Sequence, residues 1–177
     1  MARLKKIEQR PPQIRWLIRR DMPEVMEIEN RCYQFPWTED NFLTCLRERN
    51  VIGVVYESPQ NLIHGFMIYE LHKSMLKLLN FAVAPEVHGT GVGKAMVDRL
   101  FYELSQQRRN AIECEIRESN LKAQKFFSRA GFRAVRVLRR HYDETNEDAY
   151  LFRYSLQATQ QVSVDGSNRI SQYFEEA

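Results

Sequence analysis

The chain has 177 residues, of which 44% are hydrophobic and 28% are charged, so its size and polarity fit one ordinary globular domain. Its formal charge of +3 is spread over interspersed basic and acidic residues, which argues against a nucleic-acid-binding surface, and no apolar run approaches the length that spans a bilayer. The chain has three cysteines, Cys32, Cys45 and Cys114, and their spacing is not that of a metal site, which indicates reduced thiols. We therefore expect a soluble, cytoplasmic protein without a bound metal.

The first fifty residues predict one strand followed by two helices. Residues 13–20 alternate apolar and polar side chains, which predicts a half-buried strand. Asp21 is then a candidate N-cap, with Glu24 at the capping-box position of a helix. After a loop that holds aromatic residues, Thr38 is a second N-cap candidate, for a helix with an apolar face.

The chain from residue 51 to residue 156 predicts strands with two further helices between them. Residues 51–56 and 62–71 flank a turn-forming run and predict an antiparallel hairpin. Further strands are expected over 75–84, 110–117, 133–142 and 148–156, and further helices over 93–108 and 120–130. This order predicts an α/β (α+β) fold with a mixed central β-sheet flanked by helices.

The composition divides the chain into three parts. We expect an N-terminal extension over 1–12, one domain over 13–156 and a polar tail over 157–177. The extension is basic and lacks the apolar stretch of a signal peptide. The tail is rich in polar residues and has few apolar anchors, which predicts mobility.

The strongest functional signal is a glycine loop between a strand and a helix. The strand that ends at Val83 leads through His88 into the run Gly89-Thr90-Gly91-Val92-Gly93-Lys94. Glycines let a ligand approach the backbone, and free N–H groups at a helix N-terminus attract phosphate. A nucleotide P-loop would need Ser or Thr at Ala95, and a dinucleotide fingerprint would need glycine at Lys94. The run therefore predicts a different pyrophosphate site or, as the plain alternative, a tight turn that binds nothing.

The motif Val83-x-Pro85-x-x-His88-x-x-Gly91-x-Gly93 resembles the coenzyme A signature of the GNAT superfamily of N-acetyltransferases, with His88 in place of the usual Gln or Arg. Four further segments resemble its N-terminal amino-group branch, especially the bacterial ribosomal-protein alanine N-acetyltransferases: Phe35-Pro36-Trp37-Thr38-Glu39, Glu115-Ile116-Arg117-Glu118-Ser119-Asn120, Gly131-Phe132 and Glu147-Asp148-Ala149-Tyr150. The resemblance implies the GNAT fold and acetyl transfer from acetyl-coenzyme A to an amine. Its acceptor would be a protein N-terminus, such as that of a ribosomal protein.

The resemblance also implies which residues bind the coenzyme and the acceptor. The pantetheine arm would contact the backbone of Phe81, Ala82 and Val83, the pyrophosphate would contact Gly89, Thr90, Gly91, Val92, Gly93 and Lys94, and Asn120 would lie near the reacting end. Phe35, Trp37 and Tyr142 would line the acceptor site. Two plain readings stay open: Phe35 and Trp37 suit the core equally well, and His141 fits a surface loop better than a catalytic role.

The reaction needs a base, because an α-amino group with a pKa of about 8 is mostly protonated at neutral pH. The strand over 112–117 places Glu113 and Glu115 on its polar face, where the pattern alone also allows a solvated or Arg-paired carboxylate. The resemblance assigns Glu115 as the general base for direct attack on the thioester. The tyrosine that serves as the family's general acid falls on Phe127, which cannot donate a proton. The leaving thiolate could then be protonated by water or by Tyr142, or the enzyme could be slow or inactive.

Two other functions compete with N-terminal acetylation. A small-molecule amine or a lysine side chain could be the acceptor, and a lysine pKa of about 10.4 would ask more of the base. A non-catalytic coenzyme A-binding module would explain Phe127, but the glycine loop together with Glu115 favours an enzyme.

Overall fold

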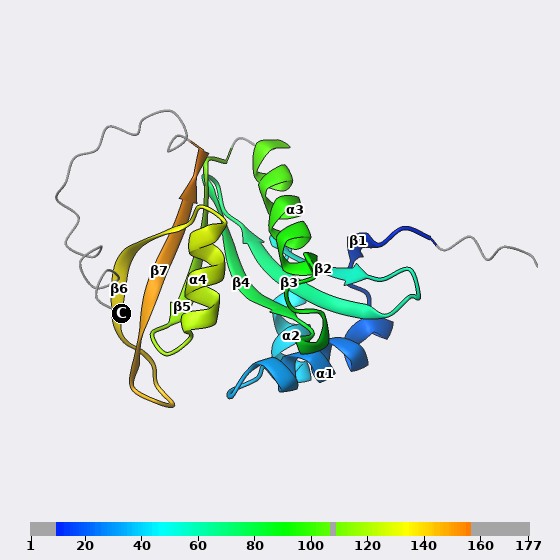
Figure 1. Cartoon of the computed structure of the whole chain (residues 1–177). Coiled ribbons are helices and arrows are strands. Elements are labelled where there is room, and N and C mark those ends of the chain that lie inside the picture. Colours follow the sequence, from blue (N-terminus) through cyan, green and yellow to red (C-terminus); the bar gives the residue numbers. More distant parts are fainter. Residues whose placement is uncertain (1–9, 107–108, 157–177) are drawn as a thin grey trace, which may run out of the picture. The chain divides into compact units, whose positions relative to one another are not determined.

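The computed structural model describes residues 10–106 and 109–156, so the expected tail and most of the expected N-terminal extension lie outside the described residues (Figure 1). Its elements in chain order are β1 (Gln13–Trp16), η1 (Arg19–Asp21), α1 (Met22–Cys32), α2 (Glu39–Leu46), β2 (Val51–Glu57), β3 (Ile63–Leu71), β4 (Met75–Val83), η2 (Pro85–Val87), α3 (Val92–Gln106), β5 (Ala111–Arg117), α4 (Leu121–Arg129), β6 (Arg133–Tyr142) and β7 (Glu147–Ser155). The strands form one mixed sheet in the order β1-β2-β3-β4-β5-β7-β6, flanked by helices, which confirms the predicted α/β (α+β) class.

The chain divides into two compact units. The first consists of the described parts of Met1–His72 and Leu78–Glu103, and the second of Lys73–Lys77 and the described parts of Leu104–Ala177. Strand β4 supplies residues to both units. Among the described residues, no helix is long and apolar enough to cross a membrane.

The first unit is built on the antiparallel pairs β1–β2 and β2–β3. Alternation along β3 separates its side chains between two faces, and Phe66 and Ile68 turn toward α1 and α2. The core on that face contains Met22, Val25, Ile28, Phe42, Val55, Ile63, Phe66, Ile68, Ala82 and Ala84. This core fixes the end of β4, where the predicted coenzyme loop begins.

Helix α3 approaches β3 closely at Gly65. A Cβ at Gly65 would come within 2.9 Å of both the Met96 sulfur and the Ala82 carbonyl oxygen. Glycine is needed here because the helix and the neighbouring backbone occupy the space of a side chain. The buried residues of α3 lie at helical spacing on one side of the helix, namely Met96, Val97, Leu100 and Leu104.

The second unit is built on the antiparallel strands β5, β7 and β6. In its register Glu113 lies opposite Arg153, and Glu115 lies opposite Leu151. Helix α4 packs through Phe127, whose ring lies 5.1 Å from that of Phe132. Cys114 is buried between the two half-buried carboxylate positions of β5, so the strand has one apolar and one polar face.

Three local predictions had mixed outcomes. The strand expected over 13–20 is wrong beyond Trp16, because η1 follows and the Ile18 N–H donates to Asp21 instead of continuing a ladder. Asp21 does occupy the N-cap of α1, but its side chain makes no capping hydrogen bond, and the Glu24 carboxylate accepts from the Ile63 N–H at 2.9 Å. The cap at Thr38 is confirmed, since its hydroxyl accepts from the Asn41 N–H.

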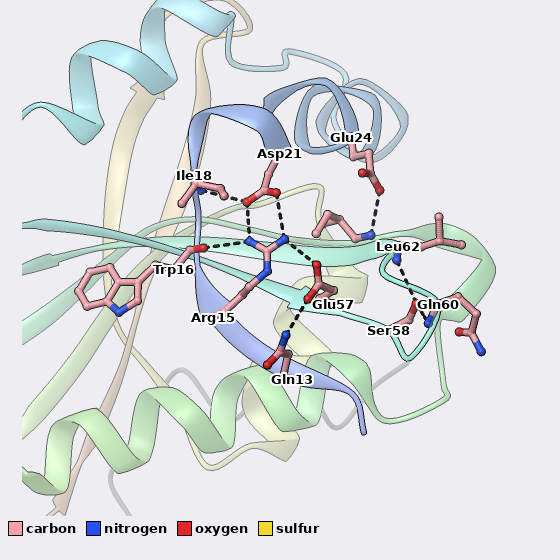
Figure 2. Close-up of polar contacts among 11 residues, drawn as sticks. Gln13, Arg15, Trp16, Ile18, Asp21, Glu24, Glu57, Ser58, Gln60 and Leu62 are labelled. Atoms are coloured by element: carbon pink, nitrogen blue, oxygen red, sulfur yellow. Dashed lines mark hydrogen bonds and ion pairs between the residues drawn. The ribbon is translucent and has the colours of Figure 1, made fainter. Parts of the chain in front are cut away.

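The Asp21 carboxylate belongs to a buried ion cluster at the end of β1, shown in Figure 2. The Arg15 guanidinium donates to Asp21 at 2.7 and 3.0 Å and to Glu57 at 2.7 Å. Burial raises the pKa of Asp21, but the hydrogen bonds from Arg15 and Ile18 outweigh it and hold that pKa below its usual value. The bonds from Arg15 and Gln13 lower the pKa of Glu57 to about 2. We call Arg15, Asp21 and Glu57 the Arg15 cluster.

Candidate active site

The end of β4 carries the three residues predicted to contact the pantetheine arm. The Phe81 carbonyl accepts from the Tyr33 hydroxyl at 2.6 Å, and the Val83 carbonyl accepts from the Cys32 thiol at 3.3 Å. Ala82 lies between them and is buried. Two of the three carbonyls are therefore already bonded to α1 and the residue that follows it, which leaves other backbone groups of this segment to contact a ligand.

His88, the departure from the family signature, binds the strand end. Its Nε2 lies 2.8 Å from the Val83 carbonyl oxygen. A carbonyl can only accept, so Nε2 carries the hydrogen in this contact. His88 thereby joins the loop to the end of β4, although its ring is exposed.

The glycine loop has the backbone conformation that its glycines predict. Gly89 and Gly91 have φ of 78° and 96°, and a Cβ at either position would meet nothing within 4 Å. These glycines are therefore required by the backbone angle and stand beside open space. The Gly91 carbonyl accepts from the Ala95 N–H at 2.9 Å, which starts α3.

The first turn of α3 supplies the predicted phosphate donors. The N–H groups of Val92, Gly93 and Lys94 precede the first residue that bonds back into the helix, Ala95. The Lys94 side chain is 77% exposed and pairs with Asp98, so it behaves as a charged residue on the solvent-facing side of the helix. The Thr90 hydroxyl donates to the Val87 carbonyl at 2.8 Å.

The two aromatic residues predicted to line the acceptor site have different environments. Phe35 is 40% exposed, whereas Trp37 is half-buried and its ring meets that of Phe42 edge-on at 5.2 Å. The Trp37 N–H donates at 2.7 Å to Glu29, a carboxylate that is only 1% exposed and also accepts from Asn80. Burial raises the pKa of Glu29, and the bonds from Trp37 and Asn80 partly oppose it. Sequence reasoning missed this anchor of the loop.

In the second unit, Glu115 is the centre of a polar group on β5. One carboxylate oxygen lies 3.0 Å from Lys77 Nζ and the other 3.1 Å from His141 Nε2. The Glu115 side chain is 25% exposed. Neither partner was predicted, although Lys77 is the charged residue of a mostly apolar strand, a signal that could have been noticed.

Tyr142 lies beside this group at the end of β6. Its ring is 3.6 Å from the guanidinium carbon of Arg117 and 5.0 Å from the ring of His141. Burial raises the pKa of Tyr142, Arg117 lowers it in part, and Glu115 adds to the rise. The hydroxyl therefore keeps its proton at neutral pH. Arg117 also binds Glu147 at 3.1 Å, which ties β5 to the start of β7.

Asn120 and Phe127 both belong to α4. The Asn120 side chain accepts from the Ala123 N–H at 3.0 Å and caps the helix, so its oxygen already has a donor. Phe127 is 5% exposed and packs edge-on against Phe126 and Phe132. Phe127 therefore serves as a packed residue of α4.

The predicted site residues therefore fall into two sets. The first unit holds Phe35, Trp37, Phe81, Ala82, Val83 and the glycine loop, and the second holds Glu115, Asn120 and Tyr142. Within the second unit, Glu115 and Tyr142 share the neighbour His141, whereas Asn120 serves as a helix cap.

Comparison with known proteins gives a consistent result. The chain is 30% identical over 133 residues to the [ribosomal protein bS18]-alanine N-acetyltransferase of Escherichia coli strain K12, an alignment that covers 74% of this chain and 88% of the relative. The crystal structure of the ribosomal-protein-S18-alanine N-acetyltransferase from Escherichia coli matches with a TM-score of 0.73 at 25% identity, covering 89% of this chain and 97% of the other. Arabidopsis thaliana NAA60 in complex with acetyl-CoA has a TM-score of 0.72 at 16% identity, covers 81% and 99% of the two chains, and supports the fold alone.

Residues 12–132 match the acetyltransferase (GNAT) family, which is more than half of the chain. The GNAT resemblance drawn from the glycine loop and its neighbouring segments is thus confirmed. The chain belongs to the acetyltransferase (GNAT) family and is an acetyl-coenzyme A-dependent N-acetyltransferase.

Proposed function

We propose that this enzyme acetylates the N-terminal α-amino group of a protein. Relatives of the chain are named as N-acetyltransferases that act on an alanine of ribosomal protein S18, which supports the proposal. The observation that carries the proposal is Glu115, a partly exposed carboxylate on the polar face of β5. An open sheet face with a carboxylate suits an amine that must lose a proton before it attacks. A ribosomal protein is the proposed acceptor.

The glycine loop would hold the coenzyme. Its pyrophosphate would accept from the amides of Gly89 to Lys94, where the helix dipole of α3 adds positive potential. The open space beside Gly89 and Gly91 supports this fit, since a side chain at either position would stand where a ligand can approach. Backbone groups of Phe81, Ala82 and Val83 would bind the pantetheine arm, and the Asn120 amide would contact the coenzyme near its thioester. When bound, the coenzyme supplies the activated acetyl group.

Glu115 would act as general base for direct attack of the amine on the thioester. Phe127 cannot serve as the acid, since phenylalanine has no donor and this ring is buried. Tyr142 retains its proton and is our candidate donor and acceptor-binding residue. Phe35 and Trp37 would also contact the acceptor.

The test compares three peptides and a panel of small amines with acetyl-coenzyme A and measures thiol release. One begins with a free alanine, the second has a blocked N-terminus and an internal lysine, and the third is blocked and lacks lysine. We expect acetylation of the first alone, because an α-amino group with a pKa of about 8 loses its proton more readily than a lysine at about 10.4.

Each other outcome rejects a defined part of the proposal. Acetylation of the blocked lysine peptide alone would assign a side-chain acceptor. Thiol release only with small amines would assign a small-molecule acceptor. Absence of release with every amine, in a protein that still binds the coenzyme, would identify a non-catalytic binding module.

A further inference from the structure

His141 contacts Glu115 because β6 does not keep a regular register with β7. The pairing shifts between Leu138 and Tyr142, and Arg140 has a left-handed φ of 48°. This irregularity lets His141 Nε2 reach within 3.1 Å of the Glu115 carboxylate. The histidine expected to be a surface residue therefore touches the proposed base.

The contact determines the state of the imidazole. A carboxylate only accepts hydrogen bonds, so Nε2 carries the hydrogen and Nδ1 of the neutral ring keeps its lone pair. The His141 side chain is 33% exposed, which leaves it accessible to water or to a substrate. A carboxylate that fixes the tautomer of an imidazole, whose other nitrogen takes a proton, is the arrangement that serine proteases use.

The second oxygen of Glu115 is held by Lys77 at 3.0 Å. The two oxygens of the Glu115 carboxylate are therefore occupied by Lys77 and by His141. Carboxylates and imidazoles have ordinary pKa values of about 4.3 and about 6.5, so an imidazole matches an α-amino group of about 8 better by roughly 100-fold. These contacts favour the imidazole of His141 as the group that accepts the proton of the amine.

We propose that His141 takes the proton of the attacking amine at Nδ1 and that Glu115 acts through His141. This inference rests on the proposed acetyl transfer and moves the proton from Glu115 to its hydrogen-bond partner. As the amine lone pair bonds to the thioester carbon, one amine N–H bond breaks and the Nδ1–H bond forms. The C–S bond then breaks, the thiolate takes up a proton from solvent, and the imidazolium returns its proton to solvent.

Charged and titratable groups around His141 come from several strands. Glu115 faces it from β5, and Lys77 of β4 reaches the same carboxylate. Tyr142 meets the ring edge-on, with Arg117 stacked on that tyrosine. On its own strand, on the turn that follows and on β7, the neighbours are Arg139, Arg140, Asp143, Glu147 and Asp148. Glu115 is the group that would balance the imidazolium charge.

The experiment measures kcat and KM of the full chain from pH 5.5 to 9 with acetyl-coenzyme A and the free-alanine peptide. His141→Gln and His141→Tyr both remove the titrating ring, and the second retains an aromatic side chain. We expect kcat to fall about 100-fold in both variants, KM for the peptide to change less than about 3-fold, and the acidic limb of the kcat profile to disappear. Added imidazole should restore part of the rate of His141→Ala.

His72→Gln is the matched control, because His72 Nε2 lies 2.9 Å from Glu70 in the first unit and has a similar exposure of 38%. It should leave kcat and its pH profile unchanged. Nitrogen NMR of the folded protein gives an independent reading, with the hydrogen on Nε2 of His141 at pH 8. Unchanged kcat and acidic limb in folded His141→Gln would overturn the inference and leave Glu115 as the base. A wild-type enzyme that acetylates no α-amine would overturn the proposed function as well.

Discussion

Each unit contains a cluster of carboxylate and basic side chains, and the two clusters differ in burial and in the kind of cation that they contain. In the Arg15 cluster, the side chains of Asp21 and Glu57 are 4% and 10% exposed and share one guanidinium. Glu115 is 25% exposed and divides its two oxygens between Lys77 and His141. A buried carboxylate with a permanent cation stays ionised and stabilises the fold. An accessible carboxylate that binds a histidine can instead orient the imidazole toward a substrate.

The largest expected effect is on catalysis, at Glu115. Glu115→Gln keeps the shape of the side chain but removes its charge, and we expect kcat/KM to fall by about 10²- to 10⁴-fold. Steady-state rates with the free-alanine peptide measure the loss, and urea unfolding should show little change in stability. Glu113→Gln is the control, since Glu113 is on the same face and pairs only at 3.4 Å with a partly exposed Arg153. A similar loss in the control would mean that the whole face, and not one carboxylate, supports the reaction.

The next effect is on stability, at Arg15. Arg15→Met leaves two buried carboxylates without their cation, and we expect the free energy of unfolding to fall by about 3 kcal/mol. Arg31→Met is the comparison, because the Arg31–Glu86 pair has the same 2.7 Å distance but exposures of 42% and 54%. In urea unfolding, Arg31→Met should lower the free energy of unfolding much less than Arg15→Met does, because solvent screens an exposed ion pair. Equal losses would show that distance, and not burial, determines the strength of these pairs.

Acid should weaken the Arg15 cluster. The folded-state pKa values of Asp21 and Glu57 are lowered, that of Glu57 to about 2 from 4.5. Their contribution is fully present above the unfolded pKa values and is lost as pH falls toward the folded ones. We expect Glu57 alone to account for a loss of about 2 kcal/mol between pH 6 and pH 3. Urea midpoints of wild type and Arg15→Met across this range test it, and parallel curves would exclude the pairing as the cause.

The smallest effect concerns Glu29, which is buried without a cation. In Glu29→Gln the side-chain oxygen can still accept from the Trp37 N–H, and the new amide can donate to Asn80 Oδ1, which is buried and has no partner among the described residues. The free energy of unfolding of Glu29→Gln should differ from that of the wild type by less than about 1 kcal/mol, whereas that of Glu29→Leu should be lower by about 2 kcal/mol. Urea unfolding distinguishes them. A large loss in Glu29→Gln would show that the negative charge itself is required in the fold.

The sequence predicted the regular elements well because their signals are local. Thr38 caps a helix through a neighbour three residues away, and the turn after Glu57 separates two apolar runs. The polar face of β5 followed from simple alternation, which left Glu113 and Glu115 as candidates, and the family resemblance selected Glu115. The strand beginning at Gln13 ended early because Asp21 captured a backbone N–H, an interaction that alternation does not encode.

The partners of Glu115 could not be predicted in the same way. Lys77 is 38 positions earlier in the chain and His141 is 26 positions later, so only the paired sheet brings them together. His141 also depends on the shifted register of β6 and on the left-handed Arg140. Periodicity arguments assume a regular pleat, which this strand does not keep.

The interleaved units limit how this enzyme can be divided into fragments. The second unit draws Lys73–Lys77 from the middle of the first, so the chain passes between units at residues 72/73, 77/78 and 103/104. A split-protein reporter cut between α3 and β5 would place Glu115 and His141 on the C-terminal piece and Lys77 on the other. Each half would then carry an incomplete polar group, and acetyl transfer would report reassembly of the two pieces.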